Sequence, residues 1–310
     1  MNGRNQNVCG GGSIPVQQNT RAVVRQCPVS SAAGMATRPV LQDDDPVMCG
    51  VLVRYTRIPM DALFVVLLFV LGAIVASFVG VVVARLHTGQ SILLGRSRCD
   101  ACGVPLSPLS LIPIASYVIF CCHARCCGTR LSLMAPFSEA LLGSLFVVAY
   151  LNLGLSVSLL FFLLALSVLL ALVLYDLMHQ ILPPSLLIIF VATAAASSFE
   201  ASFPGTFLWT FLVAVLIGGS LAAIHFFSQG RAMGLADAPL SFGLALLVGP
   251  AAFSGFIFSF WIGAVIGIVL LARRPLGSRM NTEVPFAPFL AAGFLLAYFT
   301  QWNPFILLIH

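Results

Sequence analysis

Residues 156–176, SVSLLFFLLALSVLLALVLYD, form an unbroken apolar run that ends in an aspartate. A helix of about 20 residues crosses the hydrocarbon core of a bilayer, so this run is long enough to span a membrane. The whole chain has the same character, because 60% of its 310 residues are hydrophobic, 8% are charged and the mean hydropathy is +1.04. A soluble domain cannot bury that much apolar surface. We therefore expect the lipid bilayer to be the solvent of this protein.

The other apolar runs predict an all-α polytopic membrane protein with about eight transmembrane helices. Only Gly249, Pro250 and Gly255 interrupt the apolar stretch that holds the sixth and seventh spans. We place the spans at residues 61–84, 134–153, 156–175, 184–201, 206–228, 238–255, 256–272 and 286–309.

The first 59 residues differ in composition from the rest. They are rich in Gly, Ser, Gln, Asn and Arg, which predicts a disordered N-terminal extension at residues 1–59. The sequence from Met60 reads as an ordinary membrane-protein beginning, so one hypothesis is that translation starts there. The predicted domains are then a first transmembrane helix at 60–84, a small cytoplasmic cysteine-containing domain at 85–133 and a seven-helix bundle at 134–310.

The arginines predict the orientation. After Met60 the chain has nine of them, and in this layout all nine lie in loops on one side of the membrane. The positive-inside rule makes that side cytoplasmic. The nine are Arg85, Arg96, Arg98, Arg125, Arg130, Arg231, Arg273, Arg274 and Arg279.

Two aspartates stand out among the few acidic residues. Asp176 ends the third span and Asp237 precedes the sixth. Two spans separate them, and an even number of crossings returns the chain to its starting face, so both are expected at cytoplasmic helix ends. A lone aspartate there could simply be a hydrated helix-end residue, but ionisable groups in membrane spans are costly and usually functional. The dipole at the start of a helix also favours Asp237 as a carboxylate, and Gly234 permits close backbone approach.

A facing carboxylate pair is suited to acid–base chemistry. Like charges a few ångströms apart resist ionising together, so the pair can share one proton. One carboxylate can then take a proton from water while the other protonates the carbonyl of an amide under attack. The pattern therefore favours a membrane aspartyl peptidase.

Six segments in order resemble the type IV prepilin peptidases, a family of GxGD membrane aspartyl proteases. The resemblance covers nearly everything from Met60 onward. The segments are ASFVGVVVARLHTGQSILLGRSRCDACG (76–103), LSPLSLIPIASYVIF (106–120), CCGTRLSLMAPFSEALLGSLF (126–146), YDLMHQILPP (175–184), MGLADAPL (233–240) and EVPFAPFLAAGF (283–294).

The resemblance implies that Asp176 and Asp237 are the catalytic pair. It implies a bacterial cytoplasmic (inner) membrane location, and prepilin or pseudopilin substrates whose leader is cut at the cytoplasmic surface. It also implies N-methylation of the new N-terminus with S-adenosylmethionine, for which no residue can be named. The implied partners are these substrates and the lipid bilayer, with no nucleic acid.

The sequence departs from the family pattern at three positions. The second glycine of GxGD is Ala236, the lysine usual two residues after the aspartate is Pro239, and Pro184 stands where Asp or Asn is frequent. An inactive paralogue acting in pilus or secretion assembly is therefore an alternative.

The cysteines predict a structural zinc site. Six of nine lie between Cys99 and Cys127, in the loop assigned to the reducing cytoplasm, where metal ligation is commoner than disulfides. Cys99 and Cys102 form one CxxC knuckle, and zinc takes four N or S ligands. The expected site is Cys99, Cys102 and Cys127 with either His123 or Cys126. The alternative is a decayed site with ordinary cysteines.

Two other histidines have a predicted role. His179 either tunes the carboxylate pair or is a hydrated loop residue, and His225 is expected to form a hydrogen bond within the bundle.

Two rival functions are less consistent with the sequence. A proton-coupled transporter would carry its ionisable groups near mid-membrane with an internal repeat, which this sequence lacks. A membrane thiol oxidoreductase would need its cysteines on the opposite side.

Overall fold

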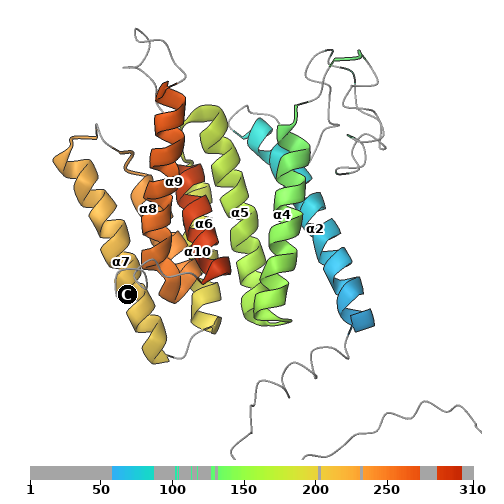
Figure 1. The fold of residues 1–310 in the computed structure, drawn as a ribbon, viewed down its shortest axis with the longest axis horizontal. Coiled ribbons are helices and arrows are strands. Elements are labelled where there is room, and N and C mark those ends of the chain that lie inside the picture. Colours follow the sequence, from blue (N-terminus) through green and yellow to red (C-terminus); the bar gives the residue numbers. More distant parts are fainter. Residues whose placement is uncertain are drawn as a thin grey trace, which may run out of the picture. The chain divides into compact units, whose positions relative to one another are not determined.

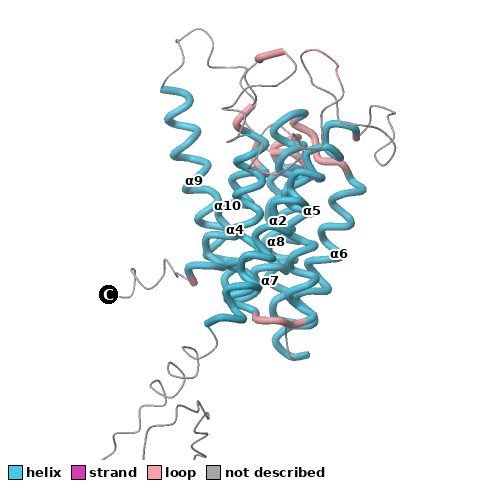
Figure 2. The backbone as a smooth tube through the Cα atoms, turned by 90° about the vertical axis from the view of Figure 1, so that its right-hand side faces the viewer, coloured by secondary structure: helices cyan, strands magenta, loops and turns pink. Residues whose placement is uncertain are grey.

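The computed structural model describes most of the chain after residue 57. The described residues are 58–86, 102, 104, 113, 117, 127–129, 132–201, 204–230, 233–272 and 285–301. Within these ranges the regular structure is entirely helical, and the helices lie side by side (Figures 1 and 2). The predicted extension at 1–59 and the predicted cysteine domain at 85–133 fall largely outside the described residues.

The helices follow the predicted spans in order. They are α2 (Ile58–Arg85), α4 (Met134–Leu153), α5 (Val157–His179), α6 (Pro184–Ala201), α7 (Pro204–Phe227), α8 (Asp237–Val248), the short 3₁₀ helix η2 (Gly249–Ala251), α9 (Ala252–Ala272) and α10 (Ala287–Thr300). By length and composition, 6 apolar stretches in the described residues could cross a membrane, one of them running through α8 and α9. The all-α polytopic architecture is therefore confirmed.

α5 is the most enclosed helix, and this explains why it is apolar all round. In its apolar window 61% of the residues are buried, against 22% in α2. Its fully buried side chains include Phe162, Leu166 and Leu172. A helix that is covered by protein or by lipid on every side needs no polar face. α2 instead leaves large apolar side chains uncovered, as expected of a helix that faces lipid.

The ends of α5 are set by local chemistry. Ser156 caps its start, because the serine hydroxyl accepts a hydrogen bond from the Leu159 amide at 3.1 Å. Gln180 ends the helix in a left-handed conformation, with φ 56°. Pro183 then precedes α6, whose first residue is Pro184. These signals place Asp176 in the last turn of α5.

The boundary between the sixth and seventh spans was predicted wrongly. The predicted sixth span ran to residue 255, but α8 ends at Val248 because Gly249 adopts φ 64°. The chain passes through η2 and resumes as α9 at Ala252. Gly255 therefore lies inside α9 and serves helix packing. The last predicted span, 286–309, corresponds to α10, which ends at Thr300; residues 302–310 are outside the described part.

Candidate active site

Asp176 and Asp237 are both buried although each lies at a helix end. Asp176 is 5% exposed and Asp237, the first residue of α8, is 7% exposed. Burying a carboxylate is costly unless other groups compensate for the lost water. Two buried carboxylates at helix ends therefore need partners.

The two carboxylates lie at the same end of the bundle, within electrostatic reach of each other. They are near enough for the charge of Asp176 to act on Asp237. α10 packs against both α5 and α8 (Figure 1). Its first residue, Ala287, donates its backbone N–H to Asp176 Oδ2 at 3.3 Å. The C-terminal end of α5 and the N-terminal ends of α8 and α10 thus meet around one acidic pair.

A tight turn presents Asp237. The backbone N–H of Gly234 donates a hydrogen bond to the Asp237 carboxylate, and the Asp237 N–H donates to the Gly234 carbonyl at 3.3 Å. A Cβ atom on residue 234 would lie 3.4 Å from Asp237 Oδ2. Glycine at this position therefore leaves one flank of the carboxylate uncovered.

The backbone at the two departures from the GxGD pattern accommodates the residues present. Ala236 precedes α8 with φ −71° and ψ −17°, a right-handed conformation that any residue adopts. Pro239 is the third residue of α8, where its missing N–H removes no helical hydrogen bond. Neither residue distorts the turn that carries Asp237.

We expect Ala236→Gly to change kcat/KM for a reaction at the acidic pair by less than about twofold, since no backbone strain is relieved. The measurement compares purified wild type and variant on one substrate. A gain of about tenfold, roughly 1.4 kcal/mol of barrier, would show instead that the Ala236 methyl obstructs catalysis.

The two histidines at this end of the bundle behave differently. His179 is exposed, and its ring lies 4.5 Å from that of Tyr175, centroid to centroid. His225, in the last turn of α7, places Nδ1 2.8 Å from the Met233 carbonyl oxygen. The expected hydrogen bond of His225 is therefore confirmed.

The predicted zinc ligands are mostly outside the described residues. Cys99, His123 and Cys126 are not described, whereas Cys102 and Cys127 are described and exposed. Cys127 Sγ lies 3.0 Å from Thr129 Oγ1. In the described part of the chain, no group of three or more His, Cys, Asp or Glu could hold a metal ion. The zinc site stays a prediction.

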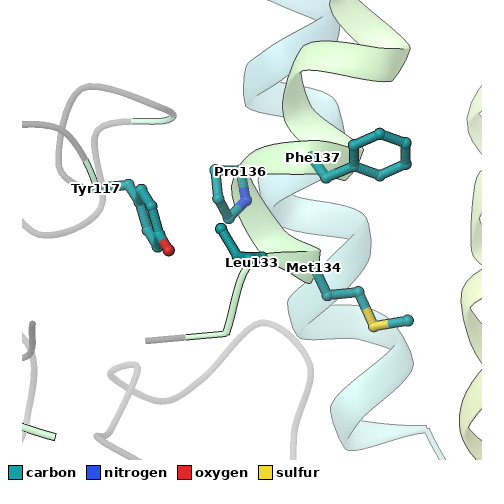
Figure 3. A pocket seen from close by; sticks show the side chains of 5 residues that line it. All are labelled: Tyr117, Leu133, Met134, Pro136 and Phe137. Atoms are coloured by element: carbon teal, nitrogen blue, oxygen red, sulfur yellow. The ribbon is translucent and has the colours of Figure 1, made fainter. Parts of the chain in front are cut away.

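A hollow of about 500 Å³ at the start of α4 does not belong to the acidic pair (Figure 3). It is open and almost wholly apolar, and none of its five lining residues is a carboxylate or a histidine. They are Tyr117, Leu133, Met134, Pro136 and Phe137. The hollow offers no pair of groups for acid–base chemistry.

Sequence reasoning did not identify the α10 contact to Asp176. The group that makes it is the backbone N–H of Ala287, and an alanine carries no chemical signal. The only hint was Pro288 near the start of an apolar run, which is typical of a helix N-terminus.

Comparison with known proteins gives consistent matches. The profile of the Bacterial Peptidase A24 N-terminal domain family matches residues 70–153. The chain is 31% identical to the prepilin leader peptidase/N-methyltransferase of Bacillus subtilis (strain 168), over 75% of this chain and 92% of that protein. It is 34% identical to the protein of the same name from Myxococcus xanthus (strain DK1622), over 71% and 68% of the two chains. No solved structure matches significantly.

Proposed function

Because this chain belongs to the prepilin leader peptidase/N-methyltransferase family, we propose that it is an aspartyl endopeptidase whose catalytic pair is Asp176 and Asp237. The observation that carries this proposal is the burial of two carboxylates, at the ends of α5 and α8, within electrostatic reach of each other. Its substrates are prepilins or pseudopilins, and it removes their leader at the cytoplasmic face of the bacterial inner membrane.

The pair acts through a shared proton and a water molecule. The ionised carboxylate takes a proton from the water, which attacks the scissile carbonyl carbon, while the protonated partner gives its proton to the carbonyl oxygen. Collapse of the tetrahedral intermediate then releases the amine with a proton from the pair. The N–H groups of Ala287 and Gly234 hold the two carboxylates in place during these steps.

Co-expression with a candidate prepilin tests the proposal. Leader removal is followed by the size and N-terminal sequence of the pilin, for wild type, Asp176→Ala and Asp237→Ala. Wild type should process the prepilin and neither variant should. Processing by either variant would remove that aspartate from the mechanism, and no processing by well-expressed wild type would favour the inactive paralogue.

The relatives' name also supports a second activity, N-methylation of the newly exposed N-terminus with S-adenosylmethionine. No described residue can be assigned to that cofactor. Purified protein given a cleaved pilin and S-adenosylmethionine should raise the mass of the pilin by one methyl group. An unchanged pilin mass would limit the chain to proteolysis.

We also propose that Cys99, Cys102 and Cys127, with His123 or Cys126, hold one structural zinc ion in the cytoplasmic loop. Wild type purified without chelator should contain about one zinc per chain, as expected for a tetrahedral cysteine-rich site. Cys99→Ser should lose most of it while Cys9→Ser, in the N-terminal extension, keeps it. Equal zinc content in wild type and Cys99→Ser would contradict the site.

A further inference from the structure

The last turn of α7 is joined to the turn that carries Asp237. His225 Nδ1 lies 2.8 Å from the carbonyl oxygen of Met233. A carbonyl oxygen can only accept a hydrogen bond, so Nδ1 of His225 carries a proton and donates it. The half-buried imidazole of His225 thus holds the peptide group that follows Met233.

That peptide group also contacts the acidic pair. The carbonyl of Met233 and the N–H of Gly234 belong to one planar, trans peptide, in which the two groups point in opposite directions. The Gly234 N–H donates to the Asp237 carboxylate. Fixing the carbonyl therefore also fixes the direction of the N–H. Hydrogen bonds in series also polarise one another, which makes this N–H a better donor.

The His225 ring is itself held in place. Gly230 has φ 75°, and a Cβ there would lie 3.3 Å from Cε1 of the ring. The Gly230 N–H donates to the His225 carbonyl at 2.9 Å and closes the end of α7. α7 is also in close contact with α8, because a Cβ on Gly218 of α7 would lie 3.1 Å from the carbonyl oxygen of Ala238 on α8. The imidazole therefore lies on a helix that packs closely against α8.

We propose that His225 is a positioning residue for leader cleavage: it orients the Met233–Gly234 peptide so that the Gly234 N–H holds Asp237 in its reactive position. This inference rests on the proposed role of Asp237. It assigns no proton transfer to His225, whose action passes entirely through the backbone.

Asparagine and leucine provide a matched test at position 225. Asn Nδ2 is as many bonds from the backbone as His Nδ1, so asparagine can donate to the Met233 carbonyl. Leucine branches at Cγ as asparagine does but has no donor. For His225→Leu we expect kcat to fall about tenfold or more with KM little changed, because small misplacements of catalytic groups are costly. His225→Asn should recover most of the loss. The same change at the exposed His179, His179→Leu, should leave kcat within about twofold.

Two measurements distinguish a loss of catalytic positioning from a loss of folded protein. Thermal unfolding of each purified variant is measured beside its cleavage kinetics. If His225→Leu does not accumulate, His225→Ala takes its place against His225→Asn. Equal kcat for asparagine and the donorless variant, or a kcat loss matched by a loss of folded protein, would overturn the inference. Asp237→Asn is assayed in parallel: cleavage by that variant near the wild-type rate contradicts the proposed function, whereas wild-type kcat in the His225 variants beside a strongly slowed Asp237→Asn contradicts the inference alone.

Discussion

Replacing Asp176 or Asp237 with asparagine should slow leader cleavage by about 10²- to 10⁴-fold, the usual contribution of a positioned acid or base. Asparagine matches aspartate in size and keeps one oxygen that can accept the Ala287 or Gly234 N–H. It cannot, however, exchange a proton with its partner. The bundle should therefore stay folded while proton transfer to and from water stops.

The double variant provides the sharper test of a shared water. Residues that act as one unit are strongly non-additive, so Asp176→Asn with Asp237→Asn should be about as slow as the slower single variant. Single-turnover cleavage of a purified prepilin by excess enzyme measures the chemical step. Glu200→Gln, an exposed carboxylate in the last turn of α6, provides the control and should cleave at the wild-type rate. Losses that multiply in the double variant would mean that the two aspartates act independently.

The order of the helices could be predicted from sequence because lipid restricts the options. A chain segment in hydrocarbon must satisfy its own backbone hydrogen bonds, so each long apolar run predicts one helix. The placement of Asp176 at the end of α5 and Asp237 at the start of α8 was predicted by the same argument, since two crossings return the chain to one face. The burial of both aspartates and the contact of Asp176 with α10 did not follow.

The details that were missed depend on backbone groups and local dihedrals. Gly249, Pro250 and Gly255 were the visible interruptions, and the predicted break at Gly255 was wrong because α8 ends where Gly249 adopts a φ of 64°. The Ala287 N–H and the Met233 carbonyl hold the site through the main chain, which every residue has. Sequence patterns identify side chains. They can therefore predict the two aspartates of this site but not the backbone groups that hold them.

The packing of α9 on α10 gives the largest expected effect outside the acidic pair. A Cβ on Gly293 of α10 would clash with the backbone nitrogen and Oγ of Ser259 on α9. A Cβ on Gly255 would lie 2.8 Å from the Cα of Phe294. Ser259, fully buried, also donates to the Leu290 carbonyl at 3.2 Å across the interface. Small residues at such close crossings are how membrane helices pack without a hydrophobic driving force.

We therefore expect Gly293→Ala to destabilise the folded protein by about 1 to 3 kcal/mol, the usual cost of overpacking. It should also reduce leader cleavage by about tenfold or more, because moving α10 moves the Ala287 N–H away from Asp176 and small misplacements at a reactive centre are costly. Thermal unfolding in detergent and cleavage kinetics measure the two effects on the same preparations.

Gly267→Ala on α9 is the matched control. A Cβ there meets nothing within 4 Å, so the added methyl should be neutral or should stabilise α9 by up to about 1 kcal/mol, the helical advantage of alanine over glycine. Leader cleavage should be unchanged. If Gly293→Ala unfolds at the wild-type temperature and cleaves at the wild-type rate, then α10 does not pack on α9 through Gly293. If it unfolds normally but cleaves slowly, the displacement is confined to the Ala287 end of α10, which supports the role of that N–H in holding Asp176.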